Sequence, residues 1–344
     1  MNMHPYTSVA VDHLMKLVNI PSPTGFTHIA AEYLLDVLRG YGFTPYKTHK
    51  GNVVCEIGGE GHPLVVAAHV DTLGAMVRSI KPNGRLRFTA IGGYPANNVE
   101  NETCVVHTRD GRTYTGTFYL TTPASHVYKG IPDIKRDDTT IEVVLDENVS
   151  TKEDVRALGI EVGDFISLDP RAFNTPSGYI KSRHLDDKAS ASVLLALAKM
   201  VSAGDLTLSR KIYLVFTVHE EVGHGCAAGL PEDAEDILSV DMGCVGDDLS
   251  CDETMVSICP KDSRGPYNYE MTGKLIELAR ENNLKYAVDI YPMYGSDADA
   301  SLAAGHNFRH ALIGPGVFAS HGYERTHVSG LDNTLKLLVA FVTD

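Results

Sequence analysis

Cysteine is scarce in this sequence and never occurs in a C-x-x-C pair. Six cysteines lie far apart among 344 residues: Cys55, Cys104, Cys226, Cys244, Cys251 and Cys259. A chain of this length buries enough surface to fold without covalent staples. The spacing therefore argues against a disulfide framework and against a thiolate-bound structural zinc. It favours small buried thiols in a reducing compartment.

Positive charge and long apolar runs are lacking as well. Lys and Arg number 30 against 44 Asp and Glu, and the formal net charge of −14 repels nucleic-acid phosphates and anionic membranes. No apolar stretch approaches the ~18 residues of a membrane-spanning helix. Asp12 and His13 interrupt the N-terminal segment, so that no signal peptide is indicated. We therefore expect a soluble, cytoplasmic protein without nucleic-acid or membrane partners.

The length and the composition are those of an ordinary globular protein. At roughly 150 residues per domain, the chain suggests about two domains, or one large domain with an insertion. Hydrophobic residues make up 43% and charged residues 22% of the sequence, which excludes a disordered chain.

Helix and strand patterns alternate at both ends of the chain, and a different pattern lies between them. The end segments 1–72 and 183–344 combine helical spacings with apolar strands, such as the run Leu64–Val70. Residues 73–182 contain short alternating runs separated by Gly, Pro, Asn and Asp, which is typical of an all-β module. The sequence predicts one discontinuous α/β domain, a mixed sheet with helices on both faces, interrupted by an inserted β-rich, barrel-like domain.

The first chemical motif stands at the end of the apolar run, at His69-Val70-Asp71. Residues two apart in a strand point to the same side, so that His69 and Asp71 can share a site at the carboxyl end of the strand. Open α/β sheets bind ligands at this edge. An adjacent carboxylate fixes the tautomer of a metal-binding imidazole and raises its basicity. The alternative interpretation is a hydrogen-bonded core histidine.

Three further segments place acidic residues beside apolar ones. Leu185-Asp186-Asp187-Lys188 begins a predicted helix, where an N-cap also explains Asp186. His219-Glu220-Glu221-Val222-Gly223 directly follows an apolar strand, and adjacent glutamates point in different directions. One of them can therefore bind a metal while the other faces a water molecule. Asp241 ends a third apolar strand.

Two histidines, His321 and His327, precede the last predicted helix. Together the motifs offer two imidazoles and three carboxylates as ligands: His69, Asp186, Glu221, Asp241 and His321. Nitrogen and oxygen donors of this kind suit zinc, cobalt or manganese. If one carboxylate bridges two ions roughly 3.5–4 Å apart, the site is that of a cocatalytic hydrolase.

In combination the segments resemble the M42 family of metallo-aminopeptidases, relatives of the glutamyl and tetrahedral aminopeptidases. The resemblance covers nearly the whole chain and includes a β insertion between the first two motifs. It rests on five segments in order: Ala68-His69-Val70-Asp71, Leu185-Asp186-Asp187-Lys188, Val218-His219-Glu220-Glu221-Val222-Gly223, Val240-Asp241-Met242-Gly243 and the His321 segment.

The resemblance implies a role for each matched ligand. Asp186 would bridge two divalent metal ions, with zinc as the first choice and cobalt or manganese as alternatives. One ion would also be held by His69 and Asp241, and the other by Glu221 and His321.

The resemblance also implies the residues of catalysis. Glu220 would be the general base, which takes a proton from the bridging water and later passes it to the leaving amine. Asp71 would orient His69, and Asp187 would be a cap or a supporting acid.

The C-terminal histidine segment differs from the family's usual His-Ser-Pro stretch. Its residues are Ser320-His321-Gly322-Tyr323-Glu324-Arg325-Thr326-His327. His327 therefore stays an alternative to His321 as the last ligand, and counting back from the final helix favours His321.

The predicted activity is the removal of N-terminal residues from peptides. Two alternatives stay open: the same metal chemistry on N-acyl amino acids or acylated sugars, and a non-catalytic scaffold in which a metal fixes subunits. The adjacent glutamates argue against the scaffold, because a structural site needs no spare base. The resemblance further implies a homo-oligomer, a dimer through the β insertion that often builds a twelve-subunit shell.

Overall fold

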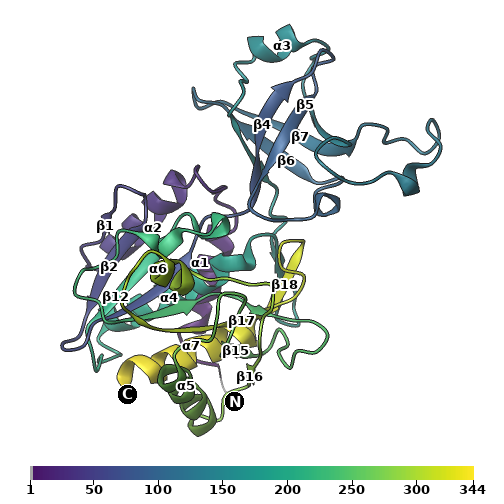
Figure 1. The fold of residues 1–344 in the computed structure, drawn as a ribbon. Helices are drawn as coiled ribbons and strands as arrows, with labels where there is room; N and C mark the ends of the chain where they lie inside the picture. The colour runs from purple at the N-terminus through teal and green to yellow at the C-terminus, as the bar shows by residue number, and fades with distance from the viewer. Residues whose placement is uncertain (1–2) are drawn as a thin grey trace. The chain divides into compact units, whose positions relative to one another are not determined.

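The computed structural model describes residues 3–344, so that residues 1 and 2 of the first predicted segment lie outside the described residues. The chain forms two compact units (Figure 1). Thr72–Pro170 form the smaller unit, and the segments on either side of it form the larger one. The mixed α/β class predicted from the sequence is confirmed.

A mixed sheet of nine strands, counted within residues 3–344, runs through the larger unit. Its order is β1 (Tyr46–Lys47), β2 (Val53–Gly58), β12 (Ile212–Thr217), β3 (Leu64–His69), β13 (Asp236–Val240), β17 (Arg309–Val317), β15 (Val256–Cys259) and β16 (Tyr286–Val288), with β14 (Gly243–Cys244) beside β17. The four central strands β12, β3, β13 and β17 are parallel, whereas β1, β2 and β15 pair with their inner neighbours in the antiparallel sense.

Side chains of the central strand β3 alternate between two hydrophobic cores. Val65 and Ala67 lie in a smaller core, which includes Ala298 of the short helix α6 (Asp297–Ala303). Leu64, Val66 and Ala68 lie in the larger core on the opposite face, with α1 (Thr7–Leu17), α2 (His28–Gly40), α4 (Leu185–Ala203), α5 (Tyr269–Glu281) and α7 (Val328–Thr343). Burial on both faces explains why the parallel strands are almost entirely apolar. Within residues 3–344 no helix has the length and apolar character needed to cross a membrane.

The boundary of the β-rich unit differs from the prediction. The sequence pattern placed the insertion at 73–182, but the compact unit ends at Pro170. The residues that follow form β10 (Phe173–Asn174) and β11 (Tyr179–Ser182), and β11 pairs with β18 (Glu324–His327) near the C-terminus. Short β strands look alike in sequence, so only this long-range pairing assigns 171–182 to the larger unit.

The Thr72–Pro170 unit is a closed barrel. Within the described residues its strand order is β4 (Gly74–Ile80), β5 (Leu86–Ile91), β8 (Ile141–Leu145), β7 (Thr113–Leu120), β6 (Thr103–His107) and β9 (Phe165–Leu168). Phe88 and Phe118 meet edge to face in its core, with ring centroids 4.9 Å apart. The single α-helix of this unit, α3 (Lys152–Ala157), begins with a capping box of Thr151 and Asp154. Closure leaves the barrel without an unpaired edge strand.

We expect Phe118→Ala to destabilise the barrel by about 3–5 kcal/mol, because it removes a fully buried ring and leaves a cavity. Urea unfolding followed by circular dichroism measures the loss. Tyr119→Ala is the matched control on the other face of the same strand, where the side chain is 36% exposed. It should change the free energy of unfolding by about 0.5 kcal/mol or less. Equal losses in the two variants would contradict the observed register.

Candidate metal centre and active site

The candidate site lies at the carboxyl ends of four neighbouring parallel strands. β12, β3, β13 and β17 each end at a chemically active residue or run into a loop that contains one. In sheet order these residues are Glu220 and Glu221, His69, Asp241 and His321. Parallel strands bring their carboxyl ends to one edge of the sheet, which is where α/β folds bind ligands.

His69 ends β3 and is only 1% exposed. Its Nδ1 lies 2.9 Å from the backbone oxygen of Asp71. Because a carbonyl oxygen can only accept, Nδ1 carries the proton and Nε2 keeps its lone pair. Nε2 faces Asp186 Oδ1 at 3.1 Å. A neutral imidazole nitrogen and a carboxylate oxygen are both electron-pair donors, so this pair requires a proton or a metal ion between them.

Asp186 lies between two imidazoles. Its Oδ1 faces His69, and its Oδ2 lies 3.4 Å from His321 Nε2 and accepts a hydrogen bond of 3.1 Å from the hydroxyl of Ser320. Burial raises the pKa of Asp186, but hydrogen bonds from His321 and His69 outweigh it and hold the pKa below its usual range. The backbone of Asp186 is not helical, as is usual at the start of a helix, but its two carboxylate oxygens face His69, His321 and Ser320 instead of capping the N–H groups of α4.

The five predicted ligands lie together. Two triplets place one donor atom of each residue within 4.8 Å of the others, namely His69 with Asp186 and Glu221, and His69 with Asp187 and Asp241. His321 Nε2 joins them at 3.6 Å from Glu221 Oε2. Asp187, expected from the sequence to be a cap or a supporting acid, thus reaches the cluster itself, and its Oδ2 accepts a hydrogen bond of 3.2 Å from the backbone of His69.

The electrostatics of this cluster suit divalent cations. Burial, followed by the charge of Asp186, raises the pKa of Glu221 well above its usual value and that of Asp241 to about 7. Buried carboxylates at this spacing repel each other unless they bind protons or a metal. Imidazole nitrogen and carboxylate oxygen are the donors that zinc, cobalt and manganese accept. The residues present therefore fit a divalent metal of this group.

Glu220 stands beside the cluster but, within residues 3–344, outside both triplets. It begins the 3-10 turn η3 (Glu220–Val222), and its Oε2 lies 3.7 Å from His69 Nε2. The Asp71 carboxylate holds this turn, because its Oδ1 and Oδ2 accept hydrogen bonds of 3.1 and 3.3 Å from the backbone N–H groups of Glu220 and Glu221. The Asp71 carboxylate is farther from His69, at 3.6 Å from Nδ1. The predicted role of Asp71 was to orient His69. Its shorter contacts are instead those with the turn that contains Glu220.

Asp297 holds both ends of the loop that contains Glu220. It accepts a hydrogen bond of 2.5 Å from the Thr217 hydroxyl and one of 2.7 Å from the backbone of Cys226 in η4 (Gly225–Ala227). A side chain at Gly225 would collide with the Asp297 carboxylate, since a Cβ there would lie 1.9 Å from Oδ1. In the sequence alone, Asp297 cannot be told apart from a helix cap.

The contacts of the two C-terminal histidines favour His321 over His327. His327 lies at the N-cap of α7, where its Nδ1 accepts a hydrogen bond of 3.0 Å from the backbone of Ser329. Its Nε2 lies 3.0 Å from the backbone oxygen of Ser177. Both ring nitrogens of His327 are therefore engaged away from the cluster, whereas His321 faces Asp186.

Glu324 is a site residue that the sequence patterns did not single out. Its carboxylate accepts one hydrogen bond of 3.1 Å from the backbone of Asp186 and another of 3.1 Å from the backbone of His321. It is 2% exposed, and burial, followed by the charge of Asp186, raises its pKa to about 8. Its position three residues after His321 was the only hint in the sequence.

Comparison with known proteins agrees with the geometry of the site. Residues 51–337 match the family described as M42 glutamyl aminopeptidase. The chain belongs to this family. It is 44% identical over 331 residues to the aminopeptidase candidate YhfE of Bacillus subtilis (strain 168), covering 96% of both chains. The lysyl aminopeptidase of Pyrococcus furiosus is 22% identical over 343 residues, again covering 96% of each.

Solved structures show the same fold. The TET1 peptidase of Pyrococcus horikoshii, described as assembling into a tetrahedron or a large octahedral shell, superposes with a TM-score of 0.85 at 21% identity. The match covers 97% of this chain and 99% of that one. As a member of the M42 family, the chain is a peptide-hydrolysing enzyme, and the scaffold alternative is thereby excluded.

Proposed function

We propose that this M42 peptidase is an aminopeptidase with two divalent metal ions, zinc by first choice. The single observation that supports it best is one buried carboxylate, Asp186, shared between His69 and His321. Asp241 would complete the protein ligands of the metal held by His69, and Glu221 would complete those of the metal held by His321. Asp187, which reaches the His69 triplet, would contribute to the first metal or hold His69 in place.

The metal pair, when bound, polarises the scissile carbonyl and lowers the pKa of the attacking water. Glu220 takes a proton from that water as the new carbon–oxygen bond forms. When the carbon–nitrogen bond breaks, Glu220 returns the proton to the leaving amine, so that one carboxyl group serves both steps. Asp71 and Asp297 keep Glu220 in reach, because Asp71 holds the turn itself and Asp297 holds the two ends of its loop.

Cleavage of aminoacyl 4-nitroanilides, each with a free or an acetylated N-terminus, tests this function on enzyme of measured metal content. We expect cleavage of the free forms only, two metal ions per chain, and loss of activity after chelation. Release of acetate without 4-nitroaniline from the acetylated compounds would instead support the deacylase alternative, and activity unchanged by chelation would contradict a metal mechanism.

Assembly belongs to the same proposal. We infer a homo-oligomer, because the TET1 peptidase that shares this fold is described as forming closed shells. The dimer interface is assigned to the barrel unit, as the family resemblance implies. Light scattering on the intact chain measures the oligomer, and a monomer at micromolar concentration would contradict it.

Glu324→Gln should raise the dissociation constants of the metals by about 10–100-fold. The Glu324 carboxylate accepts one hydrogen bond from the backbone of Asp186 and one from that of His321, each on its own oxygen, whereas a glutamine amide has only one accepting oxygen. Competition with a chromogenic chelator gives the dissociation constants. Glu253→Gln is the matched control, a buried glutamate whose carboxylate pairs with Arg325. Its metal affinity should equal that of the unmodified chain, and equal weakening in both variants would contradict the role of Glu324.

A further inference from the structure

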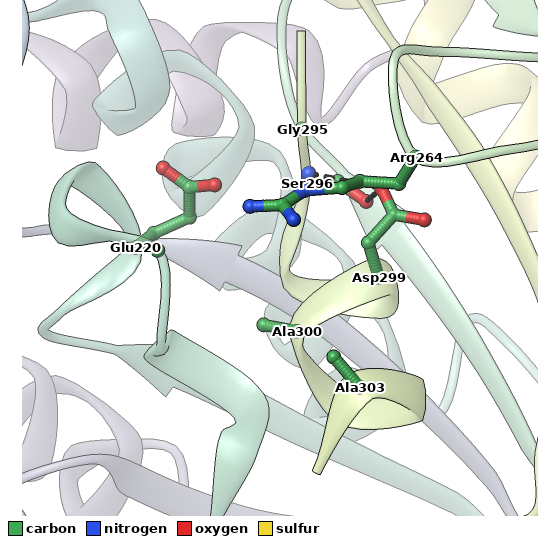
Figure 2. A pocket seen from close by; sticks show the side chains of 8 residues that line it. Glu220, Arg264, Gly295, Ser296, Asp299, Ala300 and Ala303 are labelled. Atoms are coloured by element: carbon green, nitrogen blue, oxygen red, sulfur yellow. Dashed lines mark hydrogen bonds between the residues drawn. The ribbon is translucent and has the colours of Figure 1, made fainter.

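The carboxylate of Glu220 accepts no hydrogen bond from the described part of the chain, residues 3–344. Its ion-pair contact there is the one of 3.7 Å with His69 Nε2. The side chain lines a pocket, and Figure 2 draws no bond between it and the other residues of the pocket wall. The position of the proposed base therefore depends on its backbone in the turn η3, which Asp71 holds.

Asp71 is a buried carboxylate with three hydrogen-bond donors around it. Its side chain is 0% exposed. Two of the donors are the backbone N–H groups of Glu220 and Glu221, at 3.1 and 3.3 Å. The third donor is the side-chain hydroxyl of Thr24, which lies closer, at 2.7 Å from Oδ2. A buried charge is costly unless hydrogen bonds compensate for it, so the hydroxyl of Thr24 stabilises the charged form of Asp71.

The hydroxyl of Thr24 also sets the direction in which the Asp71 carboxylate faces. Rotation about the last side-chain bond of an aspartate is soft and exchanges its two oxygens. Thr24 binds Oδ2, which leaves Oδ1 to accept from the backbone of Glu220. Without the hydroxyl the carboxylate can rotate away from that N–H group, and the turn that contains the base then loses its anchor.

The segment that contains Thr24 is itself bonded to two motifs of the site. The ammonium group of Lys188, 0% exposed, donates a hydrogen bond of 2.7 Å to the backbone oxygen of Ile20. The hydroxyl of Ser22 donates one of 2.7 Å to the backbone oxygen of Val70. Thr24 therefore approaches Asp71 from a segment that is held at two points just before it.

A tight turn then directs the Thr24 side chain inward. The backbone N–H of Phe26 donates a hydrogen bond of 2.7 Å to the backbone oxygen of Pro23, so that Thr24 is the second of four turn residues. The third, Gly25, has a φ of 94°, in the region that favours glycine. Thr24 is 7% exposed, and its hydroxyl lies against Asp71 instead of water.

We propose that Thr24 is a positioning residue, which orients the Asp71 carboxylate and through it the base Glu220. Its hydroxyl acts on the backbone of the turn and takes no part in the transfer of the proton. Thr24 lies 47 positions before Asp71 and outside all five sequence motifs. This inference rests on the proposed function, in which Glu220 is the base, and it adds a residue to that machinery.

Thr24→Val and Thr24→Ser separate the hydroxyl from the shape of the side chain. Valine keeps the branched shape without the donor, and serine keeps the donor without the methyl group. For an aminoacyl 4-nitroanilide, we expect Thr24→Val to lower kcat by about 10–100-fold. KM should stay within about threefold and the metal content should not change. Thr24→Ser should restore kcat, and Thr24→Ala, which also lacks the donor, should behave as the valine variant does.

The same valine substitution in the Glu220→Gln enzyme tests whether Thr24 acts through the base. Residues that act as one unit are not additive in a double-mutant cycle. Without the base, Thr24→Val should therefore change kcat by less than about threefold. Thr334→Val is the matched control, because Thr334 is a buried threonine of α7 whose hydroxyl donates to the backbone oxygen of Gly330 at 2.8 Å. It should leave kcat unchanged.

Three results would overturn this inference and leave the aminopeptidase function standing. They are a normal kcat in Thr24→Val and Thr24→Ala, a loss of metal from these variants, and an equal loss of kcat in Thr24→Ser. An effect of Thr24→Val that is as large in the Glu220→Gln enzyme as in the unmodified one would overturn it as well. Full activity of Glu220→Gln by itself would instead contradict the proposed function.

Discussion

Replacing Glu220 with Gln should leave the metal content intact and lower kcat by about 10²–10⁴-fold, the usual contribution of a general base. The amide has nearly the same shape as the carboxylate, but it cannot take a proton from water. Glu220 lies outside both donor triplets within residues 3–344, so the triplets should still bind metal. Its backbone anchor on Asp71 is unaffected by the substitution.

Two measurements on the same preparation decide this prediction, the metal stoichiometry by elemental analysis and kcat at saturating substrate. Glu232→Gln, at an exposed glutamate of the larger unit, is the control for loss of one negative charge. Loss of metal in the Glu220 variant would make this residue a ligand. Turnover close to normal would exclude it as the base.

Asp186→Ala should remove both metals together and lower activity by more than about 10³-fold, since the metals supply several kcal/mol of transition-state stabilisation. Both oxygens of Asp186 are directed at different histidines, so one truncation removes a ligand from each metal site. A residue that served only one site would leave the other ion bound.

The number of metal ions per chain in this variant therefore distinguishes a carboxylate that binds both metals from one that binds a single metal. Asp289→Ala is the control, because Asp289 is also buried, but its carboxylate accepts from the backbones of Ser250 and Cys251 instead. That variant should keep both ions, although it loses stability. One ion retained in the Asp186 variant would contradict bridging, and two would exclude Asp186 as a ligand.

Much of the candidate site could be predicted because chemistry and pattern coincide at the strand ends. His69 ends the otherwise apolar strand β3, Asp241 directly follows the mostly apolar strand β13, and Glu220 follows the mostly apolar strand β12 closely. A strand buried on both faces is recognisable from its composition, and a charged residue at its end is then conspicuous. The strand patterns therefore predicted that these residues meet at one edge of a sheet, and they lie at that edge in the structure.

The contacts that hold the site could not be predicted in this way. Glu324 and Asp186 lie 138 positions apart, and Asp71 and Glu220 lie 149 apart, so no local spacing relates them. The end of the barrel unit was misplaced for the same reason, because β11 finds its partner in β18.

The sequence by itself determined the class of the fold, the chemical nature of the donor set and the family to which the enzyme belongs. The fold class and the donor set follow from residue type and short-range periodicity, and the family follows from the match of the ordered sequence motifs. All of these are properties of the chain before it folds. Only the tertiary structure decided the order of the strands and the contacts of Asp71, Asp187 and Glu324. These features depend on hydrogen bonds between buried polar groups. Each such group bonds to a group that tertiary packing brings within hydrogen-bonding distance, and that group can come from any part of the chain.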